Sequence, residues 1–367
     1  MGNPKFIVSG GGTGGHIFPA LSIADGLRNR FPHCEILFVG AEGKMEMEKV
    51  PAAGYRIVGL PVAGFHRGEI WRNLAFIPKL IQSMLKAKKV VRDFCPDVVI
   101  GVGGYASGPV LRVAEKLGIP TVIQEQNSFA GVTNKILGRK ANKICVAYDK
   151  MDRFFPAGKI VFTGNPIRNG LESIIHKSNE AKEYFNITSD QPVILIVGGS
   201  LGARVLNQSV MANLELIRQS NALIIWQTGK YYYKDIQANL IVTPVPNIRV
   251  MEFIPRMDLA YSMADLVISR AGAGTISELC AVGAAAVLVP SPNVSEDHQT
   301  FNAMSLVEKE AAVMIKDGVA VKELIPYALL LLENREKCNS LSKNIKKLAT
   351  PDATEDIAEV IATLLNN

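Results

Sequence analysis

The stretch that decides the fold is Ser9–Ala20, "SGGGTGGHIFPA", which holds five glycines within six consecutive positions. Apolar residues 6–8 before it predict a buried strand, and residues 20–27 after it predict a helix. A glycine-rich turn between a strand and a helix lets backbone N–H groups close on an anion at the positive end of the helix. The glycines also satisfy G-x-G-x-x-G, so a dinucleotide site is the alternative.

Short apolar runs alternate with helix-length segments along the whole chain. Continuous apolar strands between helices are typical of parallel sheets covered on both faces. We therefore expect an α/β protein of two Rossmann-like, doubly wound parallel-sheet domains that face a cleft, with ligands at the carboxyl ends of the strands. Besides 6–8, the predicted strands are residues 36–39, 98–102, 121–123, 144–147, 193–197, 223–226, 248–250, 266–268 and 285–289.

The alternation restarts after Gly164, which suggests the domain boundary. We expect an N-terminal domain of residues 1–163 and a C-terminal domain of residues 164–351. We also expect a final amphipathic helix over residues 354–365, within the segment 352–367, which can pack on either domain, including back on the first.

Charge divides unevenly between these halves. Residues 1–163 carry 22 Lys/Arg against 12 Asp/Glu, whereas the rest of the chain carries 18 against 22. A basic half indicates an anionic partner, which leaves nucleic acid, a membrane face and a phosphorylated substrate open. The five cysteines include no C-x-x-C pair, and no signal peptide opens the chain, so we expect reduced thiols in a cytosolic compartment.

The second half contains a sharper motif at Ser269–Leu279, "SRAGAGTISEL". A small-residue turn there precedes a predicted helix that carries Glu278 in its first turns. N–H groups for phosphates beside a carboxylate for ribose hydroxyls suit a nucleoside diphosphate. Alternatively, Glu278 is only a partner of the helix dipole. The loop 290–297 then delivers His298, Gln299 and Asn302, which suit a sugar.

Seven segments in order closely resemble the MurG family of bacterial peptidoglycan synthesis. They are "GGTGGHIFPA" (11–20), "GVGGYASGP" (101–109), "QEQNSFAGVTNK" (124–135), "GNPIR" (164–168), "GGSLGA" (198–203), "SRAGAGTISEL" (269–279) and "EDHQTFNA" (296–303). The resemblance covers essentially the whole chain and implies a GT-B glycosyltransferase. The implied reaction moves N-acetylglucosamine from UDP-N-acetylglucosamine to the muramyl 4-hydroxyl of lipid I, an undecaprenyl-diphosphate muramyl-pentapeptide, to give lipid II with inversion.

The resemblance also implies the setting of the reaction. It places the protein peripherally on the cytoplasmic face of the bacterial inner membrane, in cell-wall biogenesis, cell shape and cell division. The implied partners are the two substrates, an anionic membrane surface and, as candidates, cell-wall synthesis and division proteins, with no nucleic acid. No cofactor is implied. Because no D-x-D occurs in the chain, we also expect no metal.

Carried over by position, the family's donor site lies mainly in the second domain. Ser200 faces the phosphates, Arg168 lies at the interdomain hinge, and Ile254 packs by the uracil. One departure is His298, where some members have Gln. The full set is Thr13, Gly14, Gly15, Asn127, Arg168, Ser200, Ile254, Ala273, Gly274, Thr275, Ile276, Ser277, Glu278, His298 and Gln299.

The acceptor and the catalytic base are expected in the first domain. The acceptor diphosphate is assigned to Gly11, Gly12, Gly103, Gly104 and Tyr105. The candidate bases are His16, which could instead anchor the turn or donate to a phosphate, and Glu125, which could instead orient Asn127.

A basic, apolar segment at residues 67–92 predicts the membrane contact, because it has seven Lys/Arg and one acidic residue. The predicted patch is Trp71, Phe76, Ile77, Leu80, Lys86, Lys88 and Lys89. A core helix with a solvated basic face is the alternative.

Three other functions compete with the transferase. A dehydrogenase needs an acidic residue about 20 positions beyond its glycines, whereas Glu42 lies 27 beyond Gly15. A UDP-sugar epimerase of related fold and a non-catalytic nucleotide-sugar-binding protein remain as alternatives.

Overall fold

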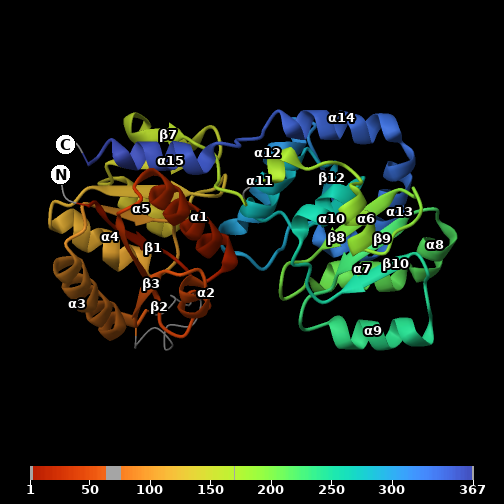
Figure 1. Ribbon diagram of the computed structural model, residues 1–367, viewed down its shortest axis with the longest axis horizontal. Coiled ribbons are helices and arrows are strands. Elements are labelled where there is room, and N and C mark those ends of the chain that lie inside the picture. The colour runs from red at the N-terminus through yellow and green to blue at the C-terminus, as the bar shows by residue number, and fades with distance from the viewer. Residues whose placement is uncertain (1–2, 63–75, 169, 366–367) are drawn as a thin grey trace. The chain divides into compact units, whose positions relative to one another are not determined.

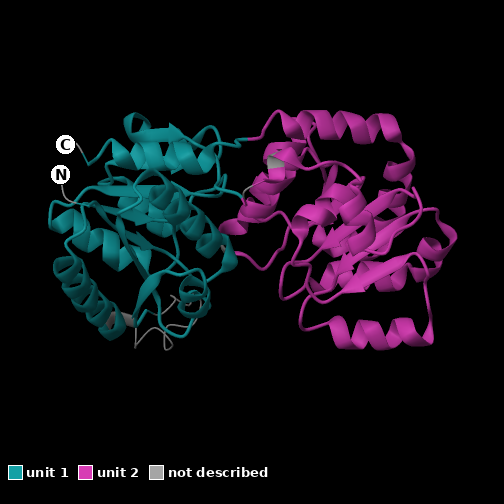
Figure 2. Ribbon diagram, in the orientation of Figure 1, with its two compact units in different colours: residues 1–167, 350–367 teal, residues 168–349 magenta. Residues whose placement is uncertain are grey.

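The computed structural model describes residues 3–62, 76–168 and 170–365. The chain forms two compact units (Figure 2). Unit 1 comprises residues 1–167 and 350–367, and unit 2 comprises residues 168–349. Each unit is built on its own parallel sheet, so each is described by itself.

Unit 1 has a seven-stranded parallel sheet in the order β3-β2-β1-β4-β5-β6-β7 within the described residues. The strand order reverses between β1 and β4, the place where such sheets bind ligands. Its strands are β1 (Lys5–Ser9), β2 (Glu35–Ala41), β3 (Arg56–Leu60), β4 (Val98–Gly101), β5 (Thr121–Glu125), β6 (Lys143–Val146) and β7 (Ile160–Phe162).

Helices cover both faces of this sheet because alternate strand residues point to opposite sides. Ile7, Val99 and Ile123 share a buried cluster with α3 (Phe76–Phe94), α4 (Ser107–Lys116) and α5 (Val132–Gly138). Phe6, Val8 and neighbouring residues pack against α1 (Gly14–Arg30) and α15 (Ala353–Ala362) on the other face. Helix α15, blue in Figure 1, therefore packs within unit 1 although it comes last in the chain. Helix α2 (Glu46–Ala52) completes the α-helices of unit 1 among the described residues.

Unit 2 has a six-stranded parallel sheet in the order β10-β9-β8-β11-β12-β13 within the described residues, with its reversal between β8 and β11. One face packs on α7 (Arg204–Ala212) and α13 (Asp317–Glu333) around the fully buried Trp226. The strands are β8 (Val193–Val197), β9 (Leu223–Gln227), β10 (Ile248–Met251), β11 (Leu266–Ser269), β12 (Ala286–Leu288) and β13 (Val313–Met314). The helices are α6 (Asn179–Tyr184), α7 (Arg204–Ala212), α8 (Leu214–Gln219), α9 (Tyr233–Val242), α10 (Met257–Met263), α11 (Ala273–Val282), α12 (His298–Val307), α13 (Asp317–Glu333) and α14 (Arg335–Lys346).

The expected fold class, two parallel-sheet α/β domains, is confirmed. The start of the first helix was predicted too late: α1 begins at Gly14 and includes Pro19, whereas residues 20–27 were expected. Glycine and proline are poor helix formers, so the helix propensity of residues 14–19 does not indicate a helix there. These residues form the first turns of α1, beside the glycine loop.

Candidate functional site

Two glycine loops meet at the strand reversal of unit 1, after β1 and after β4. A side chain on Gly104 would overlap the carbonyl oxygen of Gly11, so this approach requires glycine. A Cβ on Gly103 would lie 2.9 Å from Nε2 of His16, so this imidazole lies against the second loop. Nδ1 of His16 is 3.2 Å from the hydroxyl of Thr13. The structure therefore brings together the predicted candidate base and the predicted acceptor glycines.

The first glycine loop leads directly into the N-terminus of α1. Thr13 is the N-cap in an extended conformation, and its side chain makes no capping hydrogen bond. The first N–H groups of a helix have no acceptor inside it, and the helix dipole places positive potential there. Gly14 and Gly15 thus present backbone suited to an anion. The N–H of Gly12 is not available to an anion, because it donates to the Glu46 carboxylate. Gly12 contributes to this loop through its backbone conformation.

Glu125, the other candidate base, is a buried carboxylate enclosed by its own loop. Its Oε1 accepts the backbone N–H of Asn127 at 3.1 Å and the side-chain amide at 3.3 Å. Its Oε2 accepts from the N–H of Gly131 at 3.0 Å and from Asn134 at 2.9 Å. Four donors on one carboxylate organise the loop that carries Asn127 and hold the Glu125 side chain in place.

In unit 2, Glu278 lies on α11 within reach of two side chains. The Tyr261 hydroxyl donates to its Oε2 at 2.9 Å, and Nε of Arg168 lies 3.3 Å from its Oε1. Burial raises the pKa of Glu278, while the Arg168 charge and the Tyr261 hydrogen bond act in the opposite direction. Burial, with the Glu278 charge beside it, also raises the pKa of Tyr261. Both Glu278 contacts are side chains, which can exchange with a ligand.

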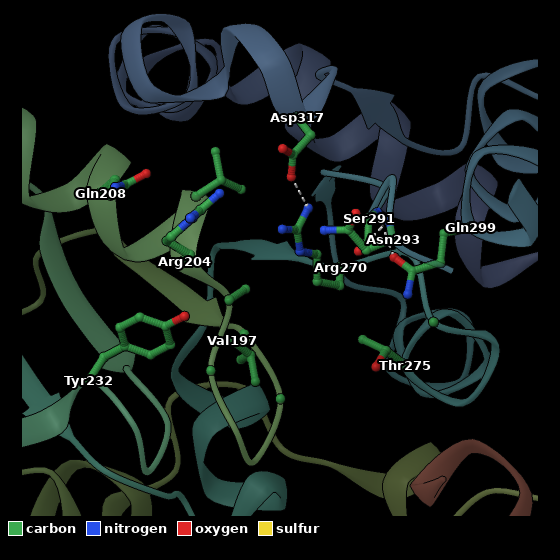
Figure 3. Close-up of a pocket in the computed structure, with 16 residues that line it drawn as sticks. Val197, Arg204, Gln208, Tyr232, Arg270, Thr275, Ser291, Asn293, Gln299 and Asp317 are labelled. Atoms are coloured by element: carbon green, nitrogen blue, oxygen red, sulfur yellow. Dashed lines mark hydrogen bonds and ion pairs between the residues drawn. The ribbon is translucent and has the colours of Figure 1, made fainter. Parts of the chain in front are cut away.

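A cavity of about 670 Å³ opens in unit 2 at the ends of β8 and β11 (Figure 3). Arg270 points to Asp317, with Nη1 2.6 Å from its Oδ2, and also donates to the carbonyls of Val289 and Pro290. Oε1 of Gln299 accepts the N–H of Ser291 at 2.8 Å, so its NH₂ group remains a donor. The cavity is lined by Val197, Gly198, Gly199, Gly202, Ala203, Arg204, Val205, Gln208, Tyr232, Arg270, Gly272, Thr275, Ser291, Asn293, Gln299 and Asp317.

The other predicted donor residues of unit 2 follow β8, β10, β11 and β12 in the chain. Ser200 is exposed in the turn after β8, Ala273–Glu278 form the first turns of α11, and His298 begins α12. Ile254 is fully buried, and its N–H donates to Gln227. Its carbonyl oxygen is therefore the backbone group that can contact the uracil.

The structure describes only part of the predicted membrane patch. Leu80 is exposed on α3, beside exposed Ile81 and Leu85. Lys88 and Lys89 are exposed, whereas Lys86 forms a 2.7 Å ion pair with Glu42. Trp71 lies outside the described residues, as do the side chains of Phe76 and Ile77. Across the described chain, no helix is long and apolar enough to cross a membrane.

Four residues were not anticipated: Glu46, Tyr261, and Arg270 with its ion-pair partner Asp317. Each acts through a partner distant in the sequence, so the pairing itself leaves no local motif. Arg270 offered the one available signal, because it directly follows a predicted strand in the quoted motif. Among the described residues, no three His, Cys, Asp or Glu side chains are grouped as metal ligands would be.

Comparisons with known proteins cover the whole chain. Residues 6–146 match the glycosyltransferase family 28 N-terminal domain, and residues 193–357 match the family 28 C-terminal domain. A relative from Parabacteroides distasonis is 54% identical over 362 residues, which is 99% of this chain and 98% of the relative. It is named "UDP-N-acetylglucosamine--N-acetylmuramyl-(pentapeptide) pyrophosphoryl-undecaprenol N-acetylglucosamine transferase".

Solved structures agree with this relationship. The crystal structure of MurG from Acinetobacter baumannii superimposes with a TM-score of 0.80 at 33% identity, covering 98% of this chain and 99% of that one. A Listeria monocytogenes protein assigned as a UDP-N-acetylglucosamine 2-epimerase has a TM-score of 0.72 at 14% identity, covering 99% and 96% of the two chains. That last likeness shows the GT-B-like fold alone. With its motifs, its two family 28 domains and its full-length relatives, the chain belongs to the MurG family of N-acetylglucosaminyltransferases.

Proposed function

We propose that this chain transfers N-acetylglucosamine from UDP-N-acetylglucosamine to the muramyl 4-hydroxyl of lipid I, producing lipid II for peptidoglycan. The observation that carries the proposal is the 54% identity, over 99% of the chain, to a relative named for this transfer. The two loop systems add physical support, since each unit presents helix N-termini and polar side chains at its strand reversal.

We assign the donor nucleotide to unit 2. The first turns of α11 and the glycine turn after β8 offer N–H groups to the diphosphate, together with Ser200 and Arg168. Glu278 accepts hydrogen bonds from the ribose hydroxyls in place of its present side-chain partners. The carbonyl of Ile254 contacts the uracil, and Gln299 and His298 contact the sugar. Thr13, Gly14, Gly15 and Asn127 of unit 1 complete the proposed donor contacts.

We assign the base to His16 and a loop-organising role to Glu125. Each oxygen of Glu125 already accepts two hydrogen bonds, whereas the His16 imidazole, a side chain able to act as a general base, lies against the acceptor loop. The acceptor oxygen forms a bond to C1 of the sugar as the bond from C1 to the UDP oxygen breaks. The hydroxyl proton passes to His16, and UDP leaves with its charge met by Arg168 and helix N-termini.

We place the protein peripherally on the cytoplasmic face of the bacterial inner membrane, through α3. Three apolar side chains, Leu80, Ile81 and Leu85, are 41%, 56% and 65% exposed there. Exposed Lys79, Lys88 and Lys89 lie on the same helix, which suits a surface of anionic lipid. This location would present the acceptor loops, including Gly103, Gly104 and Tyr105, to a diphosphate anchored in the bilayer.

Transfer of radiolabelled sugar tests this function directly. Purified protein is given UDP-[¹⁴C]N-acetylglucosamine with and without a lipid I analogue, and the lipid product is separated and counted. We expect label in the lipid product only when the acceptor is present. Release of UDP or formation of an epimerised UDP-sugar without acceptor would instead support the epimerase alternative.

A further inference from the structure

A buried carboxylate lies beneath the first glycine loop and has no part in the reaction described above. Glu46, the first residue of α2, is 1% exposed. Its Oε1 accepts the N–H of Ala41 at 2.9 Å and of Gly12 at 3.1 Å, and its Oε2 lies 3.0 Å from the same Gly12 nitrogen. In the part of the chain that the structure describes, this carboxylate is therefore held by the backbone N–H groups of the end of β2 and of the first glycine loop.

The surrounding backbone is shaped to admit this carboxylate. Gly11 and Gly12 have φ values of +145° and +89°, which favour glycine. A Cβ on Gly11 would overlap Oε1 of Glu46, and a Cβ on Gly40 would lie 2.6 Å from its Cγ. The loop thus wraps around the Glu46 carboxylate on one side. The opposite face of the loop is open, because nothing lies within 4 Å of a Cβ built on Gly12.

The anchored amide lies immediately before the groups that meet substrate. Gly12 precedes the N-cap Thr13, and His16 follows one turn into α1. A hydrogen bond to an ionised acceptor is stronger than one between neutral groups, so Glu46 fixes the course of the chain where α1 begins. Without it, the Gly12 N–H would be free to rotate toward a bound anion. The loop would then have several conformations, and ordering it on binding would cost conformational entropy.

We propose that Glu46 is a positioning residue for the acceptor, an inference that rests on the proposed function. By holding Gly12, it keeps the first glycine loop against Gly103 and Gly104 and keeps the His16 imidazole in the orientation that receives the acceptor hydroxyl. The charge of Glu46 itself never touches substrate. Its contribution is preorganisation of a loop whose five glycines would otherwise leave it mobile.

The variant Glu46→Gln separates this role from simple packing. Its amide oxygen can replace Oε1, which accepts from Ala41 and, at 3.1 Å, from Gly12. Its NH₂ group then replaces Oε2, 3.0 Å from the Gly12 nitrogen, and places a donor against the Gly12 N–H. We expect kcat/KM for a lipid I analogue to fall by about 10- to 100-fold. The Kd for UDP, measured by calorimetry, and the thermal midpoint should stay near those of the wild type. Glu48→Gln, an exposed position on the same helix, is the matched control and should match the wild type throughout.

The outcomes separate this inference from the function on which it rests. If the wild type transfers no sugar to the acceptor, the proposed function fails. If the wild type transfers and folded Glu46→Gln has the kinetics of Glu48→Gln, the positioning role is overturned. Should Glu46→Gln fail to fold, Glu46→Asp, which keeps the charge but shortens the reach, is judged by the same kinetic criterion. Loss of folding in both variants would assign Glu46 to stability alone and would also overturn the proposal.

Discussion

The glycine turns of the two units follow the same kind of strand and open the same kind of helix, yet their carboxylates are held differently. In unit 1, Glu46 is bound by backbone N–H groups beneath the loop. In unit 2, Glu278 lies on the helix itself and is bound by the side chains of Tyr261 and Arg168. A carboxylate held by backbone shapes a loop, whereas one held by side chains can exchange them for ligand hydroxyls. The first arrangement suits a fixed acceptor platform, and the second suits a nucleotide site.

The largest expected effect is the loss of turnover when the candidate base of unit 1 is removed. His16→Ala should lower turnover by about 10² to 10⁴, because the acceptor hydroxyl loses its base, while UDP affinity changes little. Steady-state kinetics with a lipid I analogue measures the first quantity and calorimetry the second. His33→Ala, an exposed histidine of the same unit, serves as control. Turnover close to that of the control would remove His16 from the reaction.

The next effect concerns membrane binding by the basic face of unit 1, which unit 2 is not expected to share. Replacing Lys86, Lys88 and Lys89 with Glu should weaken binding to anionic vesicles by about 3 kcal/mol or more, at about 1 kcal/mol for each basic residue lost. The wild type should co-sediment at low salt and be released at high salt. The matched control replaces exposed Lys49, Lys116 and Lys140 of the same unit. Equal sedimentation of both triple variants would return α3 to an ordinary solvated helix.

In unit 2, Glu278→Ala should weaken UDP binding by about 2–3 kcal/mol, the scale of lost hydrogen bonds to a charged group. Titration calorimetry with UDP on the folded variant measures this change. Glu333→Ala, at an exposed position at the end of α13, is the control. An affinity equal to the control would exclude Glu278 from the nucleotide site.

A smaller effect is expected when only the partner of Glu278 is changed. Tyr261→Phe removes a hydrogen bond that the ribose hydroxyls displace in the proposed complex, so the affinity for UDP-N-acetylglucosamine at neutral pH should change by no more than about 1 kcal/mol. That hydrogen bond also lowers the pKa of Glu278 against the effect of burial, so its loss raises this pKa further. Protonated Glu278 cannot accept as strongly, so donor affinity should decline at a higher pH in the variant as the solution is acidified. Identical pH profiles would show that Tyr261 does not tune Glu278.

Much of the fold follows from local pattern. The central strands of both sheets are continuous apolar runs, and these were predicted. Three strands were missed, β3, β7 and β13, and all lie at sheet edges. Their residues are only partly buried, so the apolar signal fades there.

The candidate site divides in the same way. The glycine turns and Glu278 stand out because their chemistry lies within a few adjacent residues. Glu46 and Asp317 do not, because they lie 34 residues from Gly12 and 47 from Arg270. A carboxylate that acts through a distant loop carries no mark in a single sequence, since only the packing of the fold brings the pair together.

Turnover measured against UDP-N-acetylglucosamine concentration, at a fixed excess of lipid I analogue, tests the division of labour between the two loops most directly. For Glu278→Ala we predict that turnover recovers toward the wild-type value as the donor saturates, because only nucleotide binding is impaired. For His16→Ala we predict that no donor concentration restores turnover, because the base is missing. Recovery of His16→Ala at high donor, or failure of Glu278→Ala to recover, would contradict the assignment of chemistry to unit 1 and nucleotide binding to unit 2.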